Sequence, residues 1–295
     1  RYPEAKAVWI TNPNYYGMGV DVERVARAAH AHGKPLLVDE AHGAHYGFHP
    51  QLPPSALACG ADLVVQSTHK MLTALTMGAM LHVRGERIDR ELLRQRLSML
   101  QSSSPSYPIM ASLDASRRLL HREGADWLQR GLQTVELAER EVRSRPCFRF
   151  VGREPTAAYE TKDPFKLVLS DATGTLDGYR LRDELERRGL MVELADPRQV
   201  LLVFSLASDA QDVERLAVAL DDVSERFGLR RKWDELGGVT GFRTGDRIRN
   251  AASGHPPGEA ETLDPISGFH EPPSAGDISE PVRLGLDKPA RTVEM

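Results

Sequence analysis

The amino-acid sequence predicts an α/β protein in which a mostly parallel sheet flanked by helices is followed by a smaller C-terminal α+β domain. Short, wholly apolar runs alternate with amphipathic stretches across residues 7–81, and buried strands separated by helices are typical of a parallel sheet covered on both faces. A second series of strand-like and helix-like segments occupies residues 151–228. We therefore divide the chain into a partial large domain (1–110), connecting helices (111–150), a small α+β domain (151–228) and a divergent, disordered tail (229–295).

Four apolar runs of the large domain have the length and composition of strands, and we place these strands at 7–10, 35–38, 63–65 and 79–81. Between the first two runs, apolar residues recur at helical spacing, which predicts a helix over residues 21–32. Asp21 suits the N-cap of this helix, and Gly33 suits the turn that ends it.

The rest of the chain changes character twice. Residues 111–145 have a charged helical pattern, and we expect it to break near Gly124 and Gly131. After residue 236, glycine and proline become frequent and apolar periodicity disappears, as in disordered segments. In the small domain we expect strands at 165–169 and 200–204 and helices at 179–188 and 212–227.

Composition narrows the class of protein. The chain has 295 residues and a net charge of -4, so nothing in its charge balance favours nucleic acid or a membrane surface as partner. No apolar run approaches the ~18 residues of a spanning helix, and we recognise no signal peptide. Its two cysteines, Cys59 and Cys147, are too few for a disulfide framework or a zinc site. We therefore expect a cytoplasmic protein.

Polar residues follow three of the predicted strands directly. These clusters are Thr11-Asn12-Pro13, Asp39-Glu40-Ala41-His42 and Ser67-Thr68-His69-Lys70. The carboxyl ends of parallel strands meet at one edge of a sheet, where ligands of such folds bind. Each cluster alone is more typical of a turn or a helix cap. Their combination predicts one shared site.

The residue types in these clusters suit pyridoxal phosphate. This cofactor needs a lysine amine for an imine link, an acid beside its pyridine nitrogen and hydrogen-bond donors around its phosphate. Lys70 can supply the amine and Asp39 the acid. Ser67 and His69 can donate to the phosphate, and Asn12 can bond the phenolic oxygen.

Lysine is scarce in this chain, with seven lysines among 38 basic residues. Lys70 alone follows a buried strand and has hydroxyl and imidazole neighbours, whereas Lys162 and Lys166 flank a strand of the small domain. His42 is a further candidate catalytic residue. His42, His45 and Asp39 also raise the possibility of a metal site, but strand-end loops without a second carboxylate at ligand spacing make that interpretation weak.

The segments at 36–45 (Leu-Leu-Val-Asp-Glu-Ala-His-Gly-Ala-His) and 66–70 (Gln-Ser-Thr-His-Lys) closely resemble the major domain of the Orn/Lys/Arg decarboxylases. Those proteins are pyridoxal-phosphate enzymes of fold type I. The segments at 10–13 and 103–107 fit the same pattern, and similarity extends to about residue 228. The Ser-x-His-Lys pattern by itself is less specific, since cysteine desulfurases carry a similar one.

The resemblance implies roles for individual residues. Lys70 matches the Schiff-base lysine, Asp39 the partner of the pyridine nitrogen, Ser67 and His69 the phosphate contacts, and Ala41 a residue on the ring face. It also implies decarboxylation of arginine, lysine or ornithine to the amine, a role in polyamine metabolism, and assembly into a homodimer or higher oligomer.

The sequence departs from the family pattern at both ends. The family's preceding segment, which holds a phosphate loop and a ring-stacking side chain, has no counterpart before Arg1, and residues 237–295 lack its C-terminal motifs. We therefore expect a fragment lacking the N-terminal part, which alone is inactive. A non-catalytic truncated paralogue is one alternative, and another fold-type-I enzyme, an aminotransferase or a cysteine desulfurase, is the other.

Overall fold

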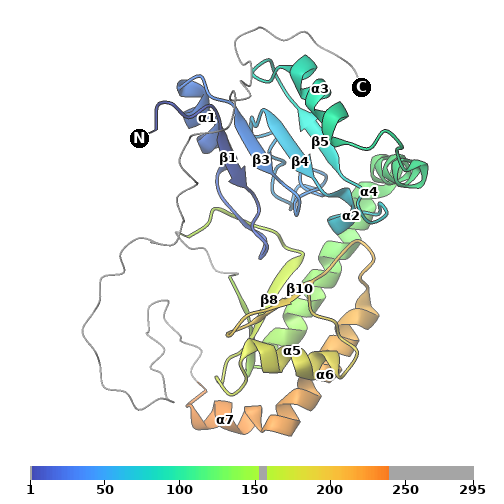
Figure 1. The fold of residues 1–295 in the computed structure, drawn as a ribbon. Coiled ribbons are helices and arrows are strands. Elements are labelled where there is room, and N and C mark those ends of the chain that lie inside the picture. Colours follow the sequence, from blue (N-terminus) through green and yellow to red (C-terminus); the bar gives the residue numbers. More distant parts are fainter. Residues whose placement is uncertain (1, 153–157, 239–295) are drawn as a thin grey trace, which may run out of the picture. The chain divides into compact units, whose positions relative to one another are not determined.

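The computed structural model describes residues 2–152 and 158–238, so most of the predicted tail lies outside the described residues. Its first sheet has the strand order β1-β3-β4-β5 (Figure 1). The strands β1 (Val8–Thr11), β3 (Leu36–Asp39) and β4 (Leu63–Gln66) are parallel, as predicted. The edge strand β5 (Met80–Val83) runs antiparallel to β4, which the sequence did not predict.

One face of this sheet is covered by α1 (Val22–Ala31). The Asp21 side chain accepts a hydrogen bond from the Arg24 N–H, which caps the helix, and Gly33 follows the helix at a φ of +64°. Val22 and Ala26 pack against Val38 and its neighbours in a small apolar core. The predicted helix and both of its end signals are confirmed.

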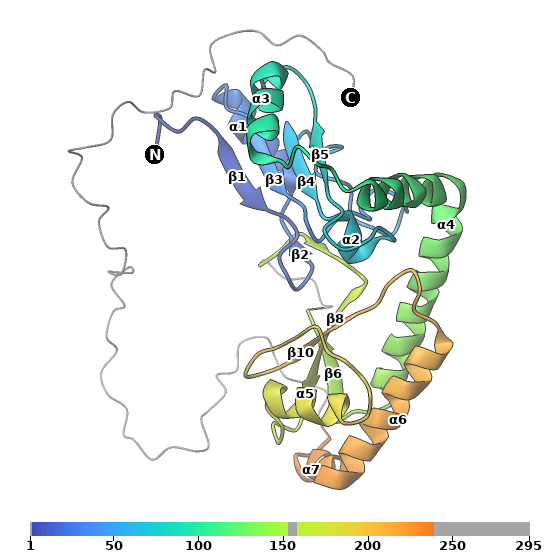
Figure 2. The ribbon, with the colours of Figure 1, turned by 45° about the vertical axis from the view of Figure 1, so that its right-hand side comes forward.

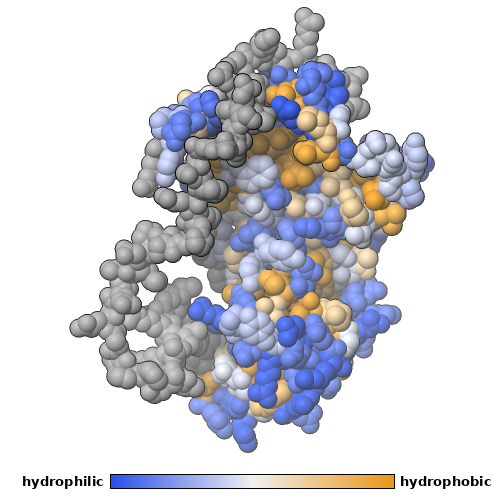
Figure 3. Space-filling view, viewed as in Figure 1, coloured by the Kyte–Doolittle hydropathy of each residue, from blue (hydrophilic) through white to orange (hydrophobic). Residues whose placement is uncertain are grey.

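The opposite face of the sheet is less covered. Trp9 and Leu37 are paired in register, and Leu37 is in turn paired with Leu63. Leu37 and Leu63 are half-buried, while Trp9 is 63% exposed. Figure 3 shows hydrophobic residues at the surface over these strands. Asp39 belongs to this same face, because it lies two residues after Leu37 on a strand whose side chains alternate.

Two helices follow the first sheet, α3 (Arg90–Leu100) and α4 (Tyr107–Arg143). The prediction of breaks near Gly124 and Gly131 was wrong: α4 is a single helix of 37 residues that changes direction along its length (Figure 2). Gly131 lies against the Phe165 ring, so a small residue there serves packing rather than termination.

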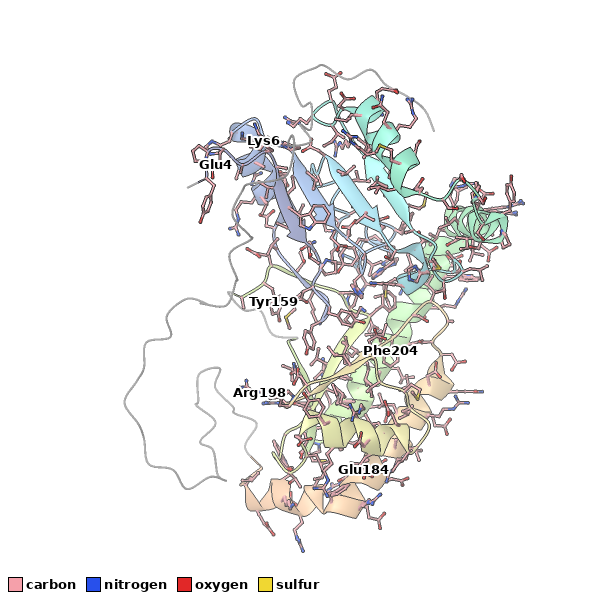
Figure 4. All side chains as sticks on the ribbon, viewed as in Figure 1. Glu4, Lys6, Tyr159, Glu184, Arg198 and Phe204 are labelled. Carbon is pink, nitrogen blue, oxygen red and sulfur yellow. The ribbon has the colours of Figure 1, made fainter. Side chains whose placement is uncertain are left out.

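The second sheet has the strand order β6-β8-β10-β9 and is antiparallel. Its strands are β6 (Phe148–Val151), β8 (Lys166–Asp171), β9 (Leu194–Ala195) and β10 (Val200–Val203), and its helices are α5 (Gly178–Glu186), α6 (Ala210–Phe227) and α7 (Leu229–Glu235). These elements and α4 enclose the larger apolar core. Side chains of this unit, including Glu184 on α5 and Phe204 after β10, are shown in Figure 4. The predicted tail was placed too early, because α7 begins at Leu229, a fully buried residue.

A two-stranded pairing and a short helix lie next to the strands of the first sheet. The strand β2 (Met18–Gly19) pairs with β7 (Thr161–Lys162), which links the loop after β1 to the chain before β8. The helix α2 (Thr68–Met71) follows β4 directly. Within the described ranges, no helix combines the length and the apolar character that a membrane crossing requires.

Candidate functional site

The three polar clusters meet at the carboxyl edge of the parallel strands. The Asn12 N–H donates to the Asp39 carbonyl (2.9 Å), and the Glu40 N–H donates to the Val65 carbonyl (2.9 Å). These bonds continue the ladder past the strand ends and place the three clusters side by side. The predicted convergence of the strand ends is therefore present in the structure.

Lys70 lies on α2 and is exposed, and its Nζ is 3.2 Å from Nε2 of His42. The His42 side chain is buried, with 8% of its surface exposed. Burial lowers the pKa of His42 to about 4, and the positive charges of Lys166 and Lys70 act in the same direction. Asp39 also acts electrostatically on this imidazole. His42 is therefore neutral at physiological pH, close to both predicted cofactor-binding groups.

Tyr15 and Glu193 also lie near His42. The Tyr15 ring centroid lies 4.5 Å from that of His42, and the Tyr15 hydroxyl donates to Glu193 Oε1 at 2.5 Å. This hydrogen bond, together with burial, raises the pKa of Tyr15. Neither Tyr15 nor Glu193 is among the site residues predicted from the sequence. Their proximity depends on contacts between distant segments that no local pattern reveals.

Lys166 is a site residue that the sequence analysis missed. It is the first residue of β8, is only 2% exposed, and its Nζ lies 3.5 Å from Nδ1 of His42. Burial lowers the pKa of this lysine. A signal was present in the sequence, because a lysine inside the apolar run 165–169 must be buried, and lysines are almost never fully buried unless they are paired.

The His45 side chain pairs with Asp163. Its Nε2 lies 3.1 Å from Asp163 Oδ2, and both side chains are almost completely buried. Burial by itself would raise the pKa of Asp163, but His45 and the Phe165 N–H hold it below its ordinary value. The Asp163 carboxylate is thus engaged by His45 and Phe165. We assign His45 to the packing around Phe165, whose ring lies 5.6 Å away.

Asp39 and Asn12 each use one oxygen locally. Asp39 Oδ1 accepts from the Ala41 N–H (3.0 Å), and Asn12 Oδ1 accepts from the Val20 N–H (2.9 Å). In the described part of the chain, Asp39 Oδ2 makes no hydrogen bond, so this oxygen is available to a ligand. The Asn12 oxygen instead fixes the loop before Val20, which leaves its amide nitrogen for any ligand contact.

The two predicted phosphate contacts, Ser67 and His69, differ in whether the side chain already has a hydrogen-bond partner. Ser67 precedes α2, and its hydroxyl makes no capping hydrogen bond. His69 Nδ1 is bonded to the Gly78 carbonyl at 2.9 Å. Because that bond requires the proton on Nδ1, a neutral His69 presents a lone pair at Nε2 and donates from that atom only when protonated. Ser67 is the better placed of the two donors.

Glu40, between Asp39 and Ala41, has a structural role. Its side chain is fully buried and accepts from the Ala56 N–H (2.8 Å) and from Gln66 Nε2 (2.6 Å). Burial raises the pKa of Glu40 to about 7, against these two hydrogen bonds. Glu40 therefore braces the turn that carries the site residues.

These residues fit the ring side of pyridoxal phosphate. Lys70 offers an exposed amine, and Asp39 offers a carboxylate oxygen without a partner in the described residues, from neighbouring strand ends. On the phosphate side, the Ser67 hydroxyl is available. Pyridoxal phosphate requires this combination of a nucleophilic amine, an acid and hydroxyl donors.

Comparison with known proteins identifies the family. The profile described as "Orn/Lys/Arg decarboxylase, major domain" matches residues 1–168. The chain therefore belongs to the Orn/Lys/Arg decarboxylase family, as its strand-end motifs predicted.

Two relatives come from Bacillus subtilis. The "Uncharacterized protein YaaO" is 42% identical over 227 residues, which is 76% of this chain and 47% of that protein. "Arginine decarboxylase" is 34% identical over 230 residues, which is 77% of this chain and 47% of that protein. The chain thus spans about half the length of the curated relatives that it matches.

The fold is shared with a solved decarboxylase. The structure of Escherichia coli constitutive lysine decarboxylase superposes with a TM-score of 0.64 at 22% identity, covering 79% of this chain and 39% of that one. This likeness confirms the predicted fold class, a fold-type-I architecture with a mostly parallel sheet.

Proposed function

We propose that this chain is the part of a pyridoxal-phosphate-dependent decarboxylase that holds the cofactor through Lys70, and that its substrate is arginine, lysine or ornithine. The observation that carries the proposal is the grouping of Lys70, Asp39 and a neutral His42 at adjoining strand ends. Membership of the Orn/Lys/Arg decarboxylase family supports the reaction. We propose polyamine metabolism, a cytoplasmic location and a homodimer or higher oligomer as its setting.

Each site residue has a distinct task in this proposal. The bound cofactor supplies an electron-withdrawing ring that accepts the electron pair released with carbon dioxide. Lys70 anchors the cofactor, and Asp39 keeps a proton on the pyridine nitrogen. Ala41 and His42 border the ring, and Ser67 donates to the phosphate. A neutral His42 adds no positive charge beside the pyridinium that Asp39 stabilises.

A basic substrate is supported by Glu193. Its carboxylate lies close enough to act on both His42 and Lys166, and within the described residues it accepts a hydrogen bond only from the Tyr15 hydroxyl. A carboxylate forms its strongest hydrogen bonds with cationic donors such as guanidinium or ammonium groups. We propose that Glu193 receives the distal cation of the substrate.

The cofactor assignment is tested by mixing the purified full chain with pyridoxal phosphate. We expect a visible absorbance band, and we expect borohydride reduction to leave the cofactor mass on the peptide that contains Lys70. Lys70→Ala should abolish both signals while leaving the circular dichroism spectrum unchanged. A band that survives in Lys70→Ala refutes the assignment.

The substrate is tested on the protein extended to the length of its relatives. The enzyme is offered an equal mixture of arginine, lysine and ornithine, and mass spectrometry identifies the amines formed. One dominant amine identifies the substrate. Amine-free mixtures from a cofactor-loaded, full-length protein contradict decarboxylation.

A second candidate is a non-catalytic truncated paralogue. A well-folded sample that binds no pyridoxal phosphate would support it. A cysteine desulfurase is disfavoured, because burial raises the pKa of both Cys59 and Cys147 and neither thiol is poised as a thiolate nucleophile. An aminotransferase remains the other fold-type-I alternative, and the amine assay separates it from a decarboxylase.

A further inference from the structure

The two nitrogens of His42 face two different lysines. Lys70 Nζ is 3.2 Å from Nε2, and Lys166 Nζ is 3.5 Å from Nδ1. Lys70 comes from α2 beside the first sheet, whereas Lys166 begins β8 of the second sheet. The imidazole therefore bridges an exposed amine and a buried one.

Hydrogen-bond chemistry restricts which of the two lysines beside His42 can carry a positive charge. A neutral imidazole has one N–H and one lone pair, and an ammonium group can only donate. If both lysines were ammonium groups, both would have to donate to His42, which has only one accepting nitrogen. Both contacts are hydrogen bonds only when one of the two amines is neutral and accepts the imidazole N–H.

The surroundings identify the neutral amine. Lys166 is 2% exposed, and no carboxylate among residues 2–152 and 158–238 forms an ion pair with it. Asp163, the acid next to it in the chain, is already bound to His45. Lys70 is exposed to water, which solvates its charge. In the resting state, an ammonium at Lys70 thus donates to Nε2, and the Nδ1–H donates to a neutral Lys166.

We propose that Lys166 is a positioning residue that accepts the proton of Lys70 through the His42 imidazole. In this step Nε2 takes a proton from the Lys70 ammonium, and Nδ1 passes its own proton to the lone pair of Lys166. The imidazole stays neutral and exchanges one tautomer for the other. Lys70 becomes a free amine with a nucleophilic lone pair, and the positive charge moves to Lys166.

Groups around Lys166 can support the transferred charge. Asp163 and Glu193 both favour a cation there, and the Tyr15 ring centroid is 5.7 Å from the amine, within the range of a cation–π interaction. Lys70 opposes it only while it is itself charged, and Asp39 acts on the imidazole between them. The transfer therefore removes the repulsion between two ammonium groups.

The role of Lys70 as nucleophile rests on the proposed function, but the test needs neither cofactor nor substrate. The full chain is treated with limiting acetic anhydride across a pH series, and mass spectrometry quantifies acetylation at Lys70. We expect Lys166→Met to shift the midpoint of Lys70 acetylation to higher pH and to reduce its rate near neutral pH several-fold. Lys166→Arg should act in the opposite direction, because a permanent cation at Nδ1 fixes the Nε2–H tautomer and requires a neutral Lys70.

If Lys166 only supported the local structure, Lys166→Met and Lys166→Arg would shift the midpoint of Lys70 acetylation in the same direction. A matched control is Lys6→Met, at the exposed residue before β1 labelled in Figure 4, which should leave the Lys70 profile unchanged. His42→Phe should reproduce the effect of Lys166→Met, and the double variant should add nothing to it. An unchanged acetylation profile in Lys166→Met, or effects of Lys166→Met and His42→Phe that add in the double variant, would refute the proton transfer from Lys70 to Lys166 through His42.

Nitrogen-15 spectra of histidine-labelled protein provide a second readout. We expect the Nδ1–H tautomer of His42 in the unmodified chain at neutral pH and the Nε2–H tautomer in Lys166→Arg. An Nε2–H tautomer in the unmodified chain would reverse the direction of transfer and refute the proposal. If pyridoxal phosphate fails to bind while the changes in Lys70 acetylation and His42 tautomer appear, the proposed function is refuted, but the proton transfer through His42 is supported.

Discussion

The Tyr15 hydroxyl and the Glu193 carboxylate, 178 positions apart in the chain, are joined by a hydrogen bond of 2.5 Å. This bond links the loop after β1 to the segment just before β9. It also orients an acidic group toward the residues around His42. The recognition of a cationic substrate, as proposed above, depends on this orientation.

Replacing Glu193 with Gln should weaken the binding of a basic amino acid. The change preserves an acceptor for the Tyr15 hydroxyl but removes the charge, and a charged hydrogen bond contributes about 1.5–3 kcal/mol, or roughly 10- to 160-fold in affinity. The KM for the amine-forming reaction measures the effect on the full-length enzyme. Glu235→Gln, on α7, is the control at an exposed position. Equal KM values in both variants would exclude Glu193 from the substrate site.

Replacing Asp39 with Asn should weaken cofactor binding and abolish turnover. The amide oxygen still accepts from the Ala41 N–H, so the local turn is retained, but a neutral amide does not hold a proton on the pyridine nitrogen. Titration with pyridoxal phosphate, followed by absorbance, gives the dissociation constant. Asp89→Asn, at the N-cap of α3, controls for a general loss of charge. Tight binding with full turnover in Asp39→Asn would contradict the assignment.

Glu40 should make the protein lose stability as pH rises. Its pKa is about 7 in the folded state against an ordinary value of 4.5, so the folded state binds the proton more tightly. The stabilisation is complete below pH 4.5 and is lost as the pH rises to about 7, by roughly 1–3 kcal/mol. Glu40→Gln should remove this dependence. Urea unfolding of both proteins at several pH values measures it, and parallel stability curves for the two proteins would refute the prediction.

The two glycines of α4 should respond oppositely to alanine. A Cβ at Gly131 would lie 2.9 Å from a Phe165 ring carbon and 3.2 Å from the Ser205 carbonyl oxygen, so Gly131→Ala should destabilise the fold by about 1–3 kcal/mol. At Gly124, the nearest atom is the end of the flexible Leu120 side chain, at 3.2 Å. Gly124→Ala should therefore stabilise the helix by about 0.5–1 kcal/mol. Thermal unfolding of the pair measures both, and a shift of the same sign in both would contradict the packing argument.

The sequence was sufficient to predict the parallel strands and the grouping of their polar ends. Those predictions follow from local properties, because apolar runs specify buried strands and parallel pairing brings their ends together. Lys166 and Glu193 could not be placed in this way, since they reach His42 through contacts between two sheets. The continuity of α4 was missed for a related reason: a glycine costs a helix only about 1 kcal/mol, and packing against Phe165 outweighs it.

The dependence of His42 on both sheets has a consequence for how the protein can be divided. A polypeptide ending before β8 would still contain every strand-end motif by which the family is recognised, yet it would lose Lys166 and Glu193. Such a piece would keep the sequence signature and lack one side of the imidazole's surroundings. Intact motifs are therefore insufficient evidence of an intact reaction centre in shortened members of this family.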